Sequence, residues 1–175
     1  MPIDIQRLRA LVRDVPDFPK PGIVFKDITP LLADEVAFSS VIDETVVHFG
    51  RGNVDKVVGI EARGFILASP VAYHFGAGFL PVRKAGKLPR VAGSRTYGLE
   101  YGTATLELPA DTVAPGARAF VVDDVLATGG TARAAARLVE RLGGKVIGIA
   151  TLIELGFLEG RKLIEGYEFF SLIRY

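Results

Sequence analysis

The stretch VVDDVLATGGTAR, residues 121–133, joins an apolar run to two adjacent aspartates and a Thr-Gly-Gly-Thr segment. The apolar residues predict a strand that is buried on both faces and ends near Asp123 and Asp124. The alanine-rich residues after Thr131 predict a helix. In open α/β sheets, ligands bind at the carboxyl edge, where a strand ends and the next helix begins. The stretch therefore predicts a ligand site at this edge of a sheet.

The polar residues of this stretch indicate which ligand fits. Two neighbouring carboxylates repel each other and are costly to bury unpaired, so they need a sugar diol, a metal ion or nearby cations. Glycine backbone at a helix N-terminus leaves amide groups open to a phosphate. An isolated Asp-Asp or Gly-Gly is more often a solvated turn or a helix cap. Their combination at one strand–helix junction favours a ribose 5-phosphate.

Other apolar runs alternate with helical stretches along the chain. Strands are predicted at 56–60, 78–82, 145–154 and 169–173, and helices at 5–12, 34–50, from 64 onward and at 131–144. This alternation predicts an α/β fold with a mostly parallel twisted sheet and helices on both faces. A length of 175 residues without repeats or linkers favours a single domain, 1–175. Residues 83–95 are basic and lack periodicity, which predicts a long loop that is either functional or mobile.

Composition excludes several classes of function. The net charge of +1 gives no bulk attraction to nucleic acid or to anionic membranes, so we expect neither as a partner. The absence of cysteine excludes disulfides, thiolate catalysis and thiolate-bound metals, and it favours a cytoplasmic protein. The uncharged run from Gly64 to Val82 contains Pro70 and His74, which favours a buried helix and strand over a membrane span.

Five further segments, in order along the chain, complete a resemblance to type I phosphoribosyltransferases, and among them to the adenine phosphoribosyltransferases. VVDDVLATGGT resembles the phosphoribosyl-diphosphate (PRPP) signature of that family. The other segments are FPKPGIVFKDITPLL (18–32), GIEARGF (59–65), RKAGKLP (83–89), YGLEYG (97–102) and LIELGFLEGR (152–161). The resemblance implies the type I fold and transfer of ribose 5-phosphate from PRPP to N9 of adenine, which gives AMP and diphosphate.

The resemblance also assigns residues to PRPP. The two aspartates would hold the ribose hydroxyls, the Thr-Gly-Gly-Thr segment the 5-phosphate, and the basic residues the diphosphate. It further implies a cis peptide at Glu61–Ala62, and Mg²⁺ carried by diphosphate and ribose hydroxyls rather than by a dedicated protein site. The residues so assigned are Arg63, Arg83, Lys84, Lys87, Asp123, Asp124, Ala127, Thr128, Gly129, Gly130 and Thr131.

Adenine recognition is implied by two other segments. Phe25 would stack on the base while the backbone of Val24 and Lys26 reads its edge, although many relatives carry arginine where this chain has Lys26. Glu100 would manage the proton at N7 while N9 attacks. The N-terminal segment and residues 83–108 would form a hood and a flexible loop. Relatives are homodimers in which this loop reaches the partner's site, so a homodimer is expected. Residues 90–96 match no pattern.

Three other interpretations stay open at this point. A PRPP-sensing regulator on the same scaffold would usually carry a DNA-binding segment and a basic face, which this sequence lacks. An enzyme for hypoxanthine, guanine or xanthine would usually place its base site after the signature helix, whereas PGIVFKD lies near the N-terminus. An unrelated nucleotide-binding α/β domain requires the colinear resemblance to be accidental, and fold alone does not settle function.

Overall fold

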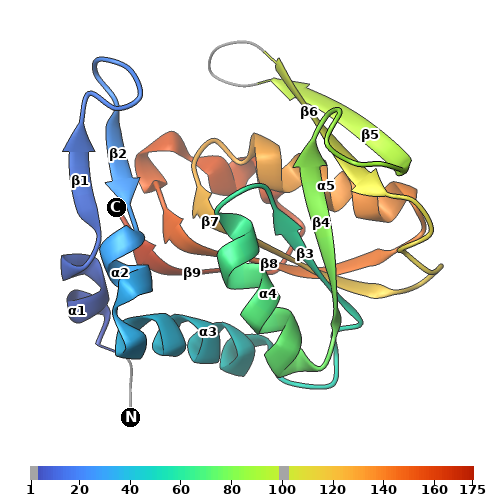
Figure 1. The fold of residues 1–175 in the computed structure, drawn as a ribbon, viewed down its shortest axis with the longest axis horizontal. Coiled ribbons are helices and arrows are strands. Elements are labelled where there is room, and N and C mark those ends of the chain that lie inside the picture. Colours follow the sequence, from blue (N-terminus) through green and yellow to red (C-terminus); the bar gives the residue numbers. More distant parts are fainter. Residues whose placement is uncertain (1–3, 99–102) are drawn as a thin grey trace. The chain divides into compact units, whose positions relative to one another are not determined.

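A computed structural model describes residues 4–98 and 103–175, and the chain divides after Glu44 into two compact units. The first unit begins with a short helix and a two-stranded antiparallel sheet (Figure 1). Its elements are α1 (Ile5–Ala10), β1 (Arg13–Pro16), β2 (Val24–Asp27), α2 (Thr29–Ala33) and most of α3 (Glu35–Phe49).

Local sequence explains how the helices of the first unit begin. The amide of Ala37 donates a 2.8 Å hydrogen bond to the Asp34 carboxylate, so Asp34 caps α3 at the residue where the sequence predicts this helix to begin. Arg7 of α1 also donates to this carboxylate, at 3.1 Å. Residues 29–33 form the short helix α2, because Pro30 has the backbone angle that a first helical turn requires.

Within the described residues, the second unit contains one sheet of seven strands in the order β5-β6-β4-β3-β7-β8-β9. The strands from β4 to β9 in this order pair in parallel, while β6 and β5 continue the sheet in antiparallel pairing. The strands are β3 (Lys56–Ile60), β4 (Gly78–Lys84), β5 (Val91–Gly98), β6 (Thr103–Pro109), β7 (Arg118–Leu126), β8 (Lys145–Glu154) and β9 (Phe169–Arg174).

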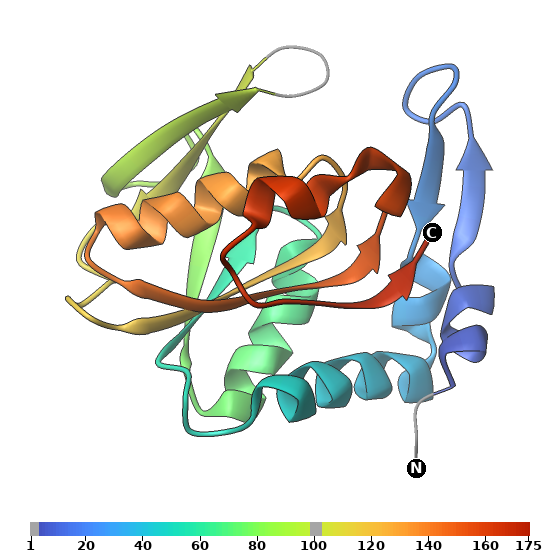
Figure 2. The ribbon, with the colours of Figure 1, turned by 180° about the vertical axis from the view of Figure 1, so that it is seen from behind.

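Two helices cover opposite faces of this sheet. Figure 1 shows α4 (Gly64–Phe75) on one face, and Figure 2, seen from behind, shows α5 (Gly130–Arg141) on the other. Two short 3-10 helices, η1 (Gly156–Leu158) and η2 (Gly160–Ile164), lie between β8 and β9 in the chain. The predicted α/β class, mostly parallel sheet and two-sided helical cover are therefore confirmed.

The sheet reverses its winding between β3 and β7, which are parallel neighbours. From β3 the chain passes through α4 to β4 on one side, whereas from β7 it passes through α5 to β8 on the other side. The connections therefore diverge at the carboxyl ends of β3 and β7 and leave a crevice, the usual ligand position in such sheets. This end of β7 carries Asp123 and Asp124.

Residues 91–98 form strand β5, so the expectation of a loop through residue 95 is wrong at this point. β5 pairs with β6 from Val91↔Pro109 to Gly98↔Thr103. The partly buried positions of β5 are Gly93, Arg95 and Tyr97. None of the three is a purely aliphatic side chain, so the apolar alternation that identifies a half-buried strand is absent from the sequence.

The buried uncharged run is confirmed as α4 followed by β4. Among the described residues, no helix is long and apolar enough to cross a membrane.

Aromatic packing fills the α4 face of the sheet. Phe120 of β7 is fully buried, with its ring 4.4 Å from that of Phe49 and 5.6 Å from that of Phe75, measured between centroids. Gly148 of β8 is also part of this packing, because a Cβ there would meet the Phe49 ring. The neighbouring β7 residue, Val121, belongs to the other core, which packs against α5.

Replacement of Phe120 by alanine should lower the free energy of unfolding by about 3–5 kcal/mol, because it removes buried apolar surface and leaves a cavity between two rings. Urea denaturation followed by circular dichroism measures this change. The matched control is Phe157→Ala, at a side chain that is 71% exposed, which should change the free energy by no more than about 0.5 kcal/mol. Equal effects of the two variants would contradict the assigned core.

Candidate active site

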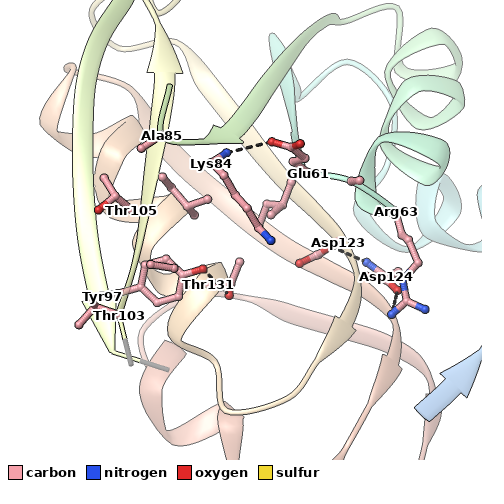
Figure 3. A pocket seen from close by; sticks show the side chains of 14 residues that line it. Glu61, Arg63, Lys84, Ala85, Tyr97, Thr103, Thr105, Asp123, Asp124 and Thr131 are labelled. Atoms are coloured by element: carbon pink, nitrogen blue, oxygen red, sulfur yellow. Dashed lines mark hydrogen bonds and ion pairs between the residues drawn. The ribbon is translucent and has the colours of Figure 1, made fainter. Parts of the chain in front are cut away.

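A cavity of about 680 Å³ opens at the carboxyl ends of β3 and β7. Figure 3 shows side chains from the β3–α4 turn, β4, β5, β6 and the end of β7 around it. Five residues that the sequence singled out line this cavity: Arg63, Lys84, Asp123, Asp124 and Thr131. The turn that contains Arg63 has the expected cis peptide at Glu61–Ala62.

The two aspartates lie side by side at the floor of the cavity. The amide of Asp124 donates a 2.9 Å hydrogen bond to the Asp123 carboxylate. Burial and the negative charge of Asp124 raise the pKa of the Asp123 carboxyl well above its usual range. Gly64, at the start of α4, is required here because a Cβ at this position would lie 2.8 Å from a carboxylate oxygen of Asp123.

Arg63 and Asp124 connect the two strand ends across the crevice. Nη2 of Arg63 lies 2.6 Å from Oδ2 of Asp124, whose side chain is only 9% exposed. Among residues 4–98 and 103–175, however, no group meets this buried oxygen with hydrogen-bonding geometry. The ion pair with Arg63 offsets part of the cost of burying this oxygen, and a hydroxyl group of a ligand would supply the hydrogen bond that it lacks.

Residues Ala127–Thr131, here called the phosphate loop, join β7 to α5. Gly129 has φ = 85°, in the left-handed region that glycine adopts without a steric penalty. The loop lines a small cavity of about 50 Å³ that shares Thr131 with the larger one. Backbone amides at the start of α5 therefore border a space beside the aspartates, an arrangement that suits a phosphate group.

Tyr97 is a residue of the site whose role the sequence did not define. It projects from β5, lines the large cavity and accepts a 3.0 Å hydrogen bond from the Thr131 hydroxyl. Its ring also lies against Gly130, where a Cβ would be 3.2 Å from the ring. The hydroxyl of Thr131 is thus hydrogen-bonded to Tyr97 of β5 without any ligand (Figure 3). Thr103 and Thr105 of β6 complete this wall.

Glu61, like Tyr97, has a side chain to which the sequence assigned no role. Its carboxylate, 7% exposed, lies 2.5 Å from Nζ of Lys87 and 3.4 Å from a guanidinium nitrogen of Arg83. The amide of Lys84 donates to it at 2.9 Å. Burial raises the pKa of the Glu61 carboxyl, but the hydrogen bonds from Lys87, the Lys84 amide and Arg83 outweigh burial and lower the pKa to about 2. Glu61 is therefore ionised and balances the basic residues.

Some of the singled-out residues are not part of the large cavity. Arg83 and Lys87 interact with Glu61 and do not line it. Val24, Phe25 and Lys26 belong to β2 of the first unit, where the Phe25 ring packs edge-on to Phe18 at 5.1 Å. Glu100 lies outside the residues that the structure describes.

The described residues contain no group of three or more histidines, cysteines or carboxylates placed to hold a metal ion. A metal ion at the cavity would therefore take most of its ligands from a bound molecule and from water. Mg²⁺ commonly binds in this way, through one or two carboxylates together with substrate phosphates.

Comparison with known proteins gives close matches over nearly the whole chain. Residues 28–173 match the family model of the phosphoribosyl transferase domain. The adenine phosphoribosyltransferase of Acidothermus cellulolyticus is 56% identical over 174 residues, 99% of this chain and 98% of that protein.

Solved structures agree with this similarity. The crystal structure of adenine phosphoribosyltransferase from Thermoanaerobacter pseudethanolicus has a TM-score of 0.94 at 50% identity and covers 98% of this chain and 100% of its own. The APRTase of Giardia lamblia, crystallised in complex with 9-deazaadenine, has a TM-score of 0.93 at 40% identity, and 99% of each chain is covered.

The Glu61 cluster should make stability depend on pH in acid. The pKa of Glu61 is lowered from an ordinary 4.5 to about 2, so its contribution is fully present above about 4.5 and is lost as pH falls toward 2. The difference in unfolding free energy between the wild type and Glu61→Gln should shrink over this range. Urea denaturation at stepped pH measures it. The exposed control Glu165→Gln should show no such change, and a pH-independent difference for Glu61→Gln would refute the assignment.

Proposed function

The chain belongs to the phosphoribosyltransferase family, among its adenine phosphoribosyltransferases, and we propose on this basis that it transfers ribose 5-phosphate from PRPP to N9 of adenine. The products are AMP and diphosphate, so the reaction salvages a free purine base. The observation that carries the proposal is the pair of adjacent aspartates beside the phosphate loop. Both lie where the winding of the sheet reverses, between β3 and β7.

The ribose 5-phosphate part of PRPP fits the edge of β7. Asp123 and Asp124 accept hydrogen bonds from the ribose hydroxyls. Oδ2 of Asp124 supports this role, because it is buried and Arg63 meets it as an ion pair but not with hydrogen-bonding geometry in the described structure. The backbone amides of the phosphate loop and the hydroxyl of Thr128 donate to the 5-phosphate, while the Thr131 hydroxyl keeps its hydrogen bond to Tyr97 and borders the same space. The partial positive charge at the start of α5 favours that dianion.

The diphosphate binds on the opposite side of the cavity, near the β3–α4 turn. Arg63 and Lys84 line the cavity there, and Arg83 and Lys87 are adjacent through Glu61. As PRPP enters, Arg83 and Lys87 can release the Glu61 carboxylate and bind diphosphate oxygens in its place, because the carboxylate and the diphosphate are both anionic. Their charge then stabilises the diphosphate as it leaves C1 of the ribose.

The recognition of adenine and the proton transfer are assigned to residues that are not among the described residues lining this cavity. Phe25 stacks on the base, and the backbone of Val24 and Lys26 reads its edge. Glu100 accepts the proton from N7 of adenine as the N9 lone pair attacks C1. The N9–C1 bond forms while the C1–oxygen bond breaks, and the electron pair of that bond remains with the diphosphate.

Mg²⁺ is proposed to enter with PRPP, bound to diphosphate and ribose oxygens. When bound, it neutralises part of the diphosphate charge. Asp123 and Asp124 fit a supporting role, because neighbouring carboxylates near the ribose hydroxyls can hold its water ligands.

We also infer a cytoplasmic homodimer, as the family resemblance implies. Val47 on α3 and Ile66 and Tyr73 on α4 are exposed apolar side chains that a partner subunit would cover. Sedimentation velocity of the purified chain measures the assembly directly.

A panel of purine bases tests the reaction. With PRPP and Mg²⁺, the purified chain should convert adenine to AMP at least about tenfold faster than hypoxanthine or guanine, because a site that hydrogen-bonds an exocyclic amine leaves groups unpaired with a 6-oxo base. Chromatography of the nucleotide products measures each rate. Equal rates, or a preference for a 6-oxopurine, would contradict the adenine assignment. Binding of PRPP without any turnover would instead indicate a sensor.

Two substitutions separate binding from chemistry. Asp124→Asn should raise the Kd of PRPP at least about tenfold, because it weakens charge-assisted hydrogen bonds worth about 1.5–3 kcal/mol. Glu100→Gln should leave this Kd unchanged and lower kcat by about 10²–10⁴. Isothermal titration calorimetry and steady-state kinetics give the two quantities. The matched control is Asp111→Asn, which alters an exposed ion pair with Arg90 and should change neither. Unaltered PRPP affinity in Asp124→Asn would exclude the proposed ribose contact.

A further inference from the structure

The segment after β8 has no part in the site described so far, yet it lies directly behind the phosphate loop. A Cβ at Gly160 would collide with the carbonyl oxygen of Ala127 and would lie 3.0 Å from the amide nitrogen of Gly129. Conversely, a Cβ at Gly129 would collide with the carbonyl oxygen of Gly160. The two backbones therefore touch without a side chain between them, so the position of residues 156–164 limits where the loop can lie.

Glu154, the last residue of β8, holds this segment in place. Its side chain is 3% exposed, and its two carboxylate oxygens each accept a 2.7 Å hydrogen bond from the Arg161 guanidinium. Ser171 donates to the same carboxylate at 3.0 Å, and Arg174 lies 3.5 Å from it. The Arg161 guanidinium also lies over the Phe169 ring, 4.7 Å from its centroid. A bidentate pair with one buried partner fixes both distance and orientation.

The same residue is connected to the start of the phosphate loop. In the sheet, Glu154 is the register partner of Leu126, the residue immediately before the loop. The amide of Leu155 donates a 2.9 Å hydrogen bond to the Leu126 carbonyl. The loop is thus fixed at its base through β8 and at its middle through Gly160, which precedes Arg161 in the chain.

We propose that Glu154 is a positioning residue for the 5-phosphate subsite: through Arg161 it holds Gly160 against the phosphate loop, so that the loop amides are oriented before PRPP binds. It does not contact the substrate. The proposal rests on the proposed function, because it requires that the loop bind the phosphate of a phosphorylated sugar. A purely structural role would affect stability and all ligands alike, whereas positioning of this loop affects only ligands that carry the 5-phosphate.

Direct binding measurements on the full chain separate these roles. The Kd of ribose 5-phosphate should rise about tenfold in Glu154→Gln, equivalent to about 1.4 kcal/mol, while the Kd of diphosphate should stay within about twofold. The KM of PRPP should rise similarly at nearly constant kcat. Arg161→Lys keeps the positive charge but loses the bidentate geometry, so its effect should be intermediate. Calorimetry gives the two Kd values, and thermal unfolding shows that each variant is folded.

Two further variants make the test decisive. Glu159→Gln is the matched control, because it neutralises an exposed carboxylate that pairs with Lys162 in the same segment and should leave both Kd values unchanged. Gly160→Ala pushes directly on the loop and should weaken ribose 5-phosphate binding even if Glu154→Gln does not fold. An unchanged Kd for ribose 5-phosphate in Arg161→Lys and Gly160→Ala, or a parallel loss of diphosphate affinity, would overturn the proposal. A wild-type chain that forms no AMP from adenine and PRPP would refute the proposed function instead.

Discussion

The architecture of the site depends on the reversal of winding between β3 and β7. Because α4 leaves β3 on one face and α5 leaves β7 on the other, the two connections cannot close over the sheet edge between them. The resulting cavity is lined on one side by the turn at Glu61–Arg63 and on the other by the end of β7. The ion pair between Arg63 and Asp124 spans this gap.

Charge at the cavity is balanced within the protein. Glu61 is paired with Arg83 and Lys87, and Asp124 with Arg63, so each of these two carboxylates has a cationic partner in the described structure. A polyanion with hydroxyl groups can replace partners on both walls at once, since its phosphates suit the cations and its hydroxyls suit the aspartates. Before the ligand arrives, the ion pairs within the protein limit the free-energy cost of keeping these charged side chains partly buried.

The phosphate loop is held from three directions. Leu126 is fixed in the sheet at its base, Gly160 lies behind it, and Tyr97 bonds to Thr131 in front. A loop of small residues has little side-chain packing of its own, so neighbouring elements must supply its rigidity. Preorganisation of this kind reduces the ordering cost of binding a phosphate.

The amino-acid sequence predicts most of the fold, and it predicts the aspartates and the glycine-containing loop of the site. Continuous apolar strands alternating with helices predict the two-sided parallel sheet, and VVDDVLATGGT predicts a sugar-phosphate site at its edge, both from local pattern. Strand β5 escapes prediction because its partly buried positions, Gly93, Arg95 and Tyr97, lack the apolar alternation that burial usually produces.

Only the tertiary structure decides which distant side chains meet. Glu61 meets Arg83 and Lys87 because β3 and β4 are parallel neighbours, and Glu154 lies beside Leu126, the residue before the phosphate loop, because β8 pairs with β7. A glutamate at the end of a strand has the same local pattern whether it is solvated or buried in such a pair. Sequence therefore determines the elements and the chemistry of their ends, while packing alone determines which of those ends lie within hydrogen-bonding distance, because that distance depends on strand order.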